Sequence, residues 1–244
     1  VARHLRLIEI PSRQRRLDPT RRPRLVDLIE HPPKAQHALQ LARRDTNERL
    51  KKLLPPHSLA VVNANDVLPT NADGTFRLWP NSDLFYLTGV EQEESVLLLC
   101  PDADDEKHRE MLFLRETNEH LVRWEGHKLT LEQARKVSGV ERVFWLSQFR
   151  PHFHRLMCEC ERVYLNSNEH KRSVIEVETR DARFVRECQQ RYPLHRYERL
   201  ARLLHELRVV KSELEIEIIK KASTITAAGF RRILRFVKPG VNEM

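Results

Sequence analysis

The chain has 244 residues and a formal net charge of +8 at pH 7, with 40% hydrophobic and 32% charged residues. This composition is typical of a globular protein and unlike that of a disordered or membrane-embedded chain. Only 6 residues are glycine, and the sequence contains no glycine-rich phosphate-binding loop of the dinucleotide or P-loop kind. No stretch approaches the roughly 20 consecutive apolar residues of a membrane span, so no membrane partner is expected.

The basic excess is concentrated at the start of the chain. Residues 1–33 hold eight arginines and four acidic residues, so this segment carries half of the net charge. Its prolines and its lack of periodicity favour a poorly ordered basic arm. Two alternatives stay open: a nucleic-acid-binding tail, which is the less favoured one, and a mitochondrial transit peptide, against which the acidic residues argue. The chain begins at Val1, which leaves its true start open.

Cysteine usage favours a cytoplasmic location. The chain has only 4 cysteines, and no apolar secretory signal precedes the domain. Such a small number is not a disulfide framework, and a reducing compartment is the default for free thiols. The cysteines are Cys100, Cys158, Cys160 and Cys188.

The first half of the chain predicts one helix followed by several strands. Helical spacing of apolar residues over 34–54, ended by Pro55-Pro56, predicts the helix. Continuous apolar runs then predict strands that are covered on both faces. The expected strands are 59–62, 84–88 (an aromatic run that ends at Gly89), 96–100 and 111–114, with a loop over 63–74 and a charged turn over 102–110.

The second half alternates between helices and strands, which is typical of an α/β layer structure. The pattern predicts helices over 130–137, 148–160 and 179–191, and strands over 143–145 and 163–165. Ser212 and Glu215 then form a capping box that opens a long amphipathic helix over 213–237. Its apolar stripe needs a partner surface, and the sequence ends soon afterwards at Met244, so we expect a chain cut from a larger protein.

No catalytic constellation stands out, and the strongest metal candidate is weak. His152, His154, Cys158 and Cys160 form a His-x-His-x3-Cys-x-Cys run, in which only His154 and Cys158 share one helical face. We favour a helix with Cys158 toward the core and solvated histidines. The acidic run 102–106 lacks the glycine and bidentate glutamate of a calcium loop, so we expect a solvated hairpin tip. We expect Trp79, Trp124 and Trp145 to be packing residues.

Five segments, in order and with sensible spacing, resemble one known family. They are Arg43-Arg44-Asp45 with Leu50; Phe76-Arg77 followed by Asn81 to Gly89 (NSDLFYLTG); Glu93 to Leu99; Leu112 to Arg115 with Trp124-Glu125-Gly126; and His205 to Ser212 with Glu215-Ile216 and Pro239-Gly240. Together they are similar to the Xaa-Pro aminopeptidases, also called aminopeptidase P. The match runs from about Lys34 to Met244.

The resemblance implies a fold and a division of the chain. Residues 34–195 resemble the N-terminal, non-catalytic domain of the creatinase/aminopeptidase P type, a mixed β-sheet flanked by helices. Residues 196–244 resemble the linker and the first long helix of a pita-bread α+β catalytic domain, which is truncated here. Residues 1–33 match nothing in the family. The complete protein is expected to cleave the bond between an N-terminal residue and a following proline, so its partner is a peptide with proline at the second position.

The family's chemistry lies outside these residues. Two divalent ions, typically manganese, activate a water in the family, and their five ligands lie downstream of the Pro-Gly that matches Pro239-Gly240. The resemblance therefore carries over no catalytic or metal residue, no cofactor is expected on this chain, and whether the chain is an enzyme stays open. The alternative is a stand-alone oligomerisation or peptide-binding module.

The matched motif residues are expected to be structural or to contact another subunit. Gly89 is expected at a turn with positive φ. Phe85 and Tyr86 either pack in the core, which we favour, or reach a neighbouring subunit's site, because this domain resembles an assembly and substrate-gating module of a homo-oligomer. The residues are Arg77, Asp83, Phe85, Tyr86, Gly89, Arg115, Trp124, Gly126, Arg208 and Lys211.

Overall fold

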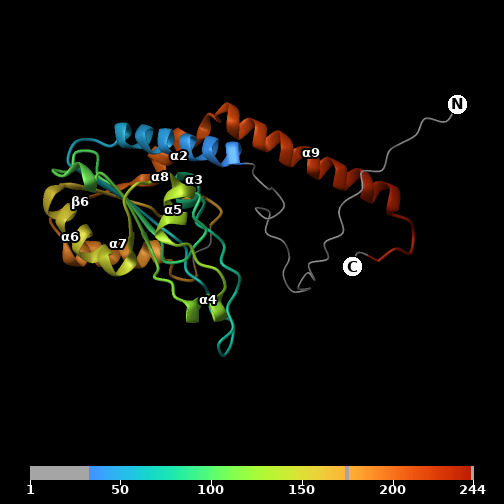
Figure 1. Cartoon of the computed structure of the whole chain (residues 1–244), viewed down its shortest axis with the longest axis horizontal. Coiled ribbons are helices and arrows are strands. Elements are labelled where there is room, and N and C mark those ends of the chain that lie inside the picture. Colours follow the sequence, from blue (N-terminus) through green and yellow to red (C-terminus); the bar gives the residue numbers. More distant parts are fainter. Residues whose placement is uncertain (1–32, 174–175, 243–244) are drawn as a thin grey trace.

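The computed structural model describes residues 33–173 and 176–242, except for the side chains of residues 33–35, 119 and 124. The predicted arm thus lies outside the described residues, apart from Pro33. Within them, a six-stranded sheet is covered by helices on both faces (Figure 1). The long helix near the C-terminus projects away from this layered body (Figure 1).

The sheet is mixed, as the family resemblance implies. Its strand order is β4-β3-β2-β1-β5-β6. Strand β2 pairs antiparallel with both β1 and β3, while the β3–β4, β1–β5 and β5–β6 pairs are parallel. The strands are β1 (Ser58–Asn63), β2 (Val96–Leu99), β3 (Glu110–Leu114), β4 (Val143–Trp145), β5 (Arg162–Leu165) and β6 (Arg196–Arg199).

The central strands are buried on both faces, which explains their continuous apolar runs. In β1, Ala60 and Val62 face one hydrophobic core, while Leu59 and Val61 face the other. Strand β2 divides its residues in the same way. Because neighbouring side chains point to opposite faces of a sheet, each position must be apolar when both faces are covered. The prediction of strands covered on both faces is confirmed for β1, β2 and β3.

The helices form two layers. Helices α2, α3, α5 and α8 contribute buried residues to the core on one face, and α6 and α7 cover the other. Short 3₁₀ turns occur at Glu106–His108 and Leu146–Gln148. The α-helices are α2 (Pro33–Leu53), α3 (Ser82–Thr88), α4 (Glu119–Glu125), α5 (Leu131–Ser138), α6 (Phe149–Glu159), α7 (Arg180–Arg191), α8 (Leu200–Val209) and α9 (Glu213–Phe236).

The strand expected at 84–88 is wrong, because these residues form helix α3. The side chain of Asn81 accepts hydrogen bonds from the backbone N–H groups of Asp83 and Leu84 at 3.0 and 3.1 Å, which caps the helix. Gly89 ends it with φ +69. Leu84 and Leu87, three residues apart, are the side chains that the helix buries. Helices α4 and α8 and strand β6 are elements that the sequence pattern did not indicate.

Helix α9 begins at the predicted capping box, in which Ser212 and Glu215 each bind the other's backbone N–H. It has 24 residues, and none of them is buried. Its apolar stripe, which includes Ile219, Phe230 and Ile233, is exposed. Among the described residues, no helix combines the length and apolar character that a bilayer crossing requires.

Candidate functional site

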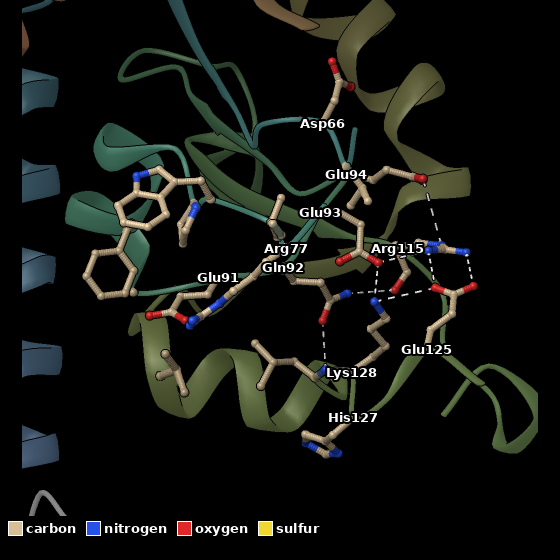
Figure 2. Close-up of a pocket in the computed structure, with 18 of the residues that line it drawn as sticks. Asp66, Arg77, Glu91, Gln92, Glu93, Glu94, Arg115, Glu125, His127 and Lys128 are labelled. Atoms are coloured by element: carbon tan, nitrogen blue, oxygen red, sulfur yellow. Dashed lines mark hydrogen bonds and ion pairs between the residues drawn. The ribbon is translucent and has the colours of Figure 1, made fainter. Parts of the chain in front are cut away.

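A groove of about 1300 Å³ lies between helices α2, α3 and α5 and the loops beside them. Figure 2 shows the charged side of this groove, where acidic and basic side chains are joined by hydrogen bonds and ion pairs. They come from the segment before β2, the end of β3 and the turn between α4 and α5. The remaining wall carries the rings of Phe76, Trp79 and Phe85. The groove therefore combines a charged floor with an aromatic wall.

Glu93 is the buried centre of the charged floor, with 6% of its surface exposed. Its Oε1 accepts a hydrogen bond from Arg115 Nη1 at 2.9 Å and another from Lys128 Nζ. Burial alone raises the pKa of a carboxyl group, but the hydrogen bonds from Lys128 and Arg115 outweigh it, and the pKa of Glu93 lies below its ordinary value. Glu93 is therefore a carboxylate that holds Arg115 and Lys128 in the charged floor.

Arg115 joins the floor to the end of helix α4. Its guanidinium donates two hydrogen bonds to the Glu125 carboxylate, at 2.7 and 3.0 Å, in addition to the bond to Glu93. The hydrogen bonds to Glu125 are the main reason why the pKa of Arg115 is raised. Gln92 holds the same region with two hydrogen bonds. Its Nε2 donates to the Arg115 carbonyl, and its Oε1 accepts from the Leu129 N–H. A two-pronged arginine–carboxylate pair fixes direction as well as distance.

The aromatic wall is exposed. Trp79 is 79% exposed, Phe76 61% and Phe85 37%. Large exposed aromatic rings at the edge of a groove mark a surface suited to contact with another polypeptide, since they bury much apolar area at little entropic cost. The expectation that Trp79 is a packing residue is wrong. Trp145 packs against the core as expected, and the side chain of Trp124 lies outside the described part of the structure.

Gly89 has a positive φ, as the sequence predicts, and lies directly against Arg43 of helix α2. A Cβ atom at residue 89 would lie 2.3 Å from the Arg43 Cζ atom, so the guanidinium fills the space that a side chain would occupy. Arg43 Nη1 donates to the Val137 carbonyl at 2.7 Å, and burial lowers the pKa of Arg43. These contacts connect α2, α3 and α5 in the wall of the groove.

Comparison with known proteins places these features in a family. The family model described as "Aminopeptidase P, N-terminal domain" matches residues 42–164. The chain belongs to the aminopeptidase P family. This region contains the charged floor and the aromatic wall of the groove. The match confirms the resemblance drawn from the sequence motifs.

Curated relatives of the aminopeptidase P family are longer than this chain. The Xaa-Pro aminopeptidase of Escherichia coli (strain K12) is 26% identical over 209 residues, which cover 84% of this chain and 47% of the relative. The mitochondrial intermediate cleaving peptidase 55 of Arabidopsis thaliana is 25% identical, over 77% of this chain and 35% of its own length. The chain thus spans about half or less of the curated relatives it matches.

Solved structures of aminopeptidase P share the fold. The low-pH form of the E. coli enzyme superposes with a TM-score of 0.66 at 26% identity, covering 84% of this chain and 46% of the enzyme. A Zn-substituted E. coli Aminopeptidase P in complex with product gives a TM-score of 0.66 at 25% identity, with coverages of 84% and 46%. The mixed sheet flanked by helices is therefore the N-terminal-domain fold of aminopeptidase P.

The aminopeptidase P motif residues fall into two places. Arg77, Phe85, Gly89 and Arg115 line the groove. Asp83, Tyr86, Arg208 and Lys211 lie together where α3 meets α8: Arg208 contacts Asp83 and Tyr86, and Lys211 Nζ donates to the carbonyls of Arg208 and Val209 at 2.7 and 3.1 Å. Tyr86 is partly buried and packs against the core. Trp124 lies in the last turn of helix α4, and Gly126 follows as its C-cap.

The residues present do not fit the two metal ions that the family implies. Within the described ranges, no three His, Cys, Asp or Glu side chains gather into a metal-binding group. In the acidic turn, Asp102 accepts a hydrogen bond from the His57 backbone N–H at 2.6 Å, and Asp105 caps the N–H of Lys107 at 2.9 Å. These carboxylates bind backbone N–H groups of the hairpin, and Asp104, Asp105 and Glu106 are exposed, so the predicted solvated hairpin tip is confirmed. The described side chains therefore provide no group that could bind the family's two metal ions.

The His/Cys run in helix α6 is divided by the structure. Cys160 is buried, whereas Cys158 is exposed, so the expectation that Cys158 faces the core is wrong. His152 is partly buried and packs against Phe144 and His108 instead of being solvated. His154 and Cys158 remain together on the outer side.

The sequence analysis missed the residues that complete the floor. Glu93 and Glu125 lie inside matched motifs but were not singled out, and Lys128 lies in no motif. Arg43 belongs to the first matched segment, yet only the structure shows it against Gly89. A buried glutamate such as Glu93 could have been suspected from Glu93-Glu94 directly before an apolar strand, because a charge so close to the core needs a partner.

Proposed function

We propose that this chain is the N-terminal, non-catalytic portion of a metal-dependent Xaa-Pro aminopeptidase. Residues 34–195 are its accessory domain, and residues 196–244 are the linker and the first long helix of the pita-bread domain. The family match, the motif order and the greater length of the curated relatives support this proposal. The complete protein would hydrolyse the bond before a proline with two divalent ions, manganese by resemblance, whereas this chain alone would not turn over peptide.

The accessory domain would serve in assembly and substrate gating. The observation that carries this proposal is the exposed aromatic wall beside a floor held by ion pairs. Phe85, Trp79 and Phe76 offer apolar area to a second subunit, while the floor behind them is pre-organised and needs no reordering on contact. Phe85 belongs to the family motif, so we propose that it reaches the neighbouring subunit of a homo-oligomer.

Helix α9 supports the proposed division of the chain. A helix with an exposed apolar stripe is stable when another surface covers that stripe. Within the described residues, α9 buries no side chain, in contrast to α8 directly before it, which buries Leu200, Leu204 and Leu207. We propose that the remainder of the complete protein covers the α9 stripe.

Sedimentation velocity on this chain tests the assembly proposal. We expect a concentration-dependent oligomer that is weakened at least tenfold by Phe85→Ser or Trp79→Ser. Leu194→Ser is the matched control, since Leu194 is 97% exposed and does not line the groove. Equal association of all four proteins would contradict the assembly role of the aromatic wall, while leaving the family membership intact.

The alternative of a stand-alone peptide-binding module uses the same groove. Fluorescence titration of the chain with a short peptide that has proline at its second position separates the two, because Trp79 lines the groove. Saturable binding that Phe76→Ser abolishes while the Trp79 reporter is retained, without any oligomer, would favour the module.

Two further expectations stay proposals. Nucleic-acid binding through residues 1–33 concerns a segment outside the described residues, and a salt-sensitive DNA shift lost on its deletion would support it. A cytoplasmic location also stays a proposal, because the Arabidopsis relative is named as mitochondrial.

A further inference from the structure

The proposed function leaves one pair of chemically active side chains unused on helix α6. Cys158 Sγ lies 3.9 Å from Nε2 of His154, one helical turn earlier. Cys158 and His154 are both exposed, on the outer side of the helix. A thiolate and an imidazole nitrogen are the two ligand types that Zn²⁺ binds most readily in proteins.

The separation of the two atoms is close to the one that a single zinc ion requires. Zinc bonds of about 2.3 Å to sulfur and about 2.0–2.1 Å to nitrogen, at a tetrahedral angle, place the two ligand atoms about 3.6 Å apart. The observed 3.9 Å differs from this by only a few tenths of an ångström. Small rotations of two exposed side chains close that difference without moving the backbone.

Tyr192 holds His154 from outside the helix. The Tyr192 hydroxyl lies 2.9 Å from His154 Nδ1, on the ring nitrogen that does not face the sulfur. The tyrosine ring contacts Phe153 edge-to-face at 5.9 Å, which anchors it. When the Nδ1 proton is donated to the tyrosine oxygen, the Nε2 lone pair faces Cys158. Such a hydrogen bond to the second nitrogen is the usual support of a metal-binding histidine.

Cys158 is also the thiol best placed to bind a metal. Cys100, Cys160 and Cys188 are buried, so their sulfur atoms are closed to a metal ion from solvent. Cys158 is the exposed one of the four cysteines, all of which lie in the described residues. Solvent and metal ions can reach its sulfur.

We propose that His154 and Cys158 bind one Zn²⁺ ion per chain, with Tyr192 orienting the imidazole and water completing the coordination. Binding forms one Zn–S and one Zn–N bond, and the thiol proton of Cys158 passes to the buffer. The site is open, with two protein ligands, and so differs from closed structural zinc centres, which have four. The inference does not depend on the proposed function.

Titration of the chain with Zn²⁺ by calorimetry, and with Co²⁺ by absorption spectroscopy, tests the proposal. We expect one ion per chain and a thiolate-to-cobalt charge-transfer band. Cys158→Ser removes the band, His154→Ala weakens Zn²⁺ binding at least tenfold, and Tyr192→Phe weakens it about tenfold. The control His205→Ala changes an exposed histidine of α8 and leaves binding unchanged. Binding that survives both ligand substitutions would overturn the proposal.

A second measurement uses only the unaltered protein. Iodoacetamide modification, mapped by mass spectrometry of peptides, reports the reactivity of each cysteine separately. We expect Zn²⁺ to slow the modification of Cys158 at least tenfold, with the buried cysteines slow in both conditions. An unchanged rate at Cys158 in saturating Zn²⁺ would contradict the site. Neither readout depends on peptidase activity or on oligomer formation, so a failure here is separate from a failure of the proposed function.

Discussion

Arg208 donates a hydrogen bond to Asp83 at 2.5 Å, and this contact joins helix α8 to helix α3 across 125 residues of sequence. The other oxygen of Asp83 accepts from Asn166 Nδ2 at 2.8 Å, directly after strand β5. The Arg208 guanidinium also lies 5.1 Å from the centre of the Tyr86 ring. One carboxylate thus connects helix α3, helix α8 and the residue that follows strand β5.

Removing the Asp83 carboxylate will destabilise the domain. Asp83→Ala leaves Arg208 and Asn166 without their shared acceptor, and we expect a loss of about 1–3 kcal/mol in the free energy of unfolding. Urea denaturation followed by circular dichroism measures it. The exposed pair of Lys136 and Glu132 on α5 is the matched control, and Glu132→Gln should leave stability unchanged. Equal effects of the two substitutions would mean that the Asp83 contacts contribute nothing specific.

Glu93→Gln will weaken the groove floor in a pH-dependent manner. Because the pKa of Glu93 is lowered in the folded chain, its contribution is present above its unfolded pKa and is lost as the pH falls through the folded value. We expect Glu93→Gln to cost about 1.5–3 kcal/mol at pH 7 and less at pH 3. Glu125→Gln, on the more exposed partner of Arg115, should cost less. A constant Glu93→Gln penalty from pH 7 to pH 3 would contradict this account.

Asp181→Asn will stabilise the protein at neutral pH. Burial raises the pKa of Asp181 to about 6, although the hydrogen bond from Asn63 Nδ2, at 2.9 Å, opposes the shift. A raised folded pKa means that the group favours folding below its unfolded pKa and that this contribution disappears as the pH rises through 6. Asparagine keeps the acceptor for Asn63 without the charge, so we expect a gain of about 2 kcal/mol at pH 7.5.

The pH profile of that gain is the decisive readout for Asp181. Both proteins carry a neutral side chain at this position below about pH 4, where the difference should vanish. Urea denaturation at several pH values between 4 and 8 measures it. If the free energies of unfolding of the wild type and Asp181→Asn change with pH in the same way, the pKa of Asp181 is not raised in the folded protein.

Gly89→Ala will destabilise the junction of α2, α3 and α5. A methyl group there would meet the Arg43 guanidinium, and the backbone at φ +69 adds a strain of about 1 kcal/mol for a residue with a side chain. We expect a total loss of about 2–3 kcal/mol in thermal or urea unfolding. In an Arg43→Ala background the steric part disappears, so the Gly89→Ala penalty should fall to about 1 kcal/mol. An unchanged penalty in that background would exclude the contact as its cause.

Much of the fold was predictable from the sequence, because buried elements require apolar residues in a recognisable pattern. The run Leu59 to Val62 is apolar at each position since both faces of β1 are covered. Helix α9 begins at the capping box that the sequence displays at Ser212, and Thr130 and Gln133 form the same arrangement at the start of helix α5. Helix α3 was misassigned because its aromatic residues suit a strand as well, and the cap at Asn81 decides the outcome.

The candidate site was less accessible to sequence reasoning. The floor joins Glu93 to Lys128 across 35 residues, and α4 and α5 must both be in place before that contact exists. Lys128 belongs to no motif, so nothing in its neighbourhood indicates a buried ion pair. Motif order identified Arg115 and Gly89, but it did not show that they line one groove. Local patterns report burial and capping, whereas partners in a charge network are set by tertiary structure.

The most direct test of the central claim is a peptidase assay of this chain alone. A purified sample is incubated with Mn²⁺ and a peptide that has proline at its second position, and release of the first residue is followed. The account predicts no turnover above the metal-only blank, because we propose that the family's metal ligands lie outside this chain, and no three possible ligands gather among the described residues. Release of the N-terminal residue at a rate proportional to the concentration of this chain would contradict the account.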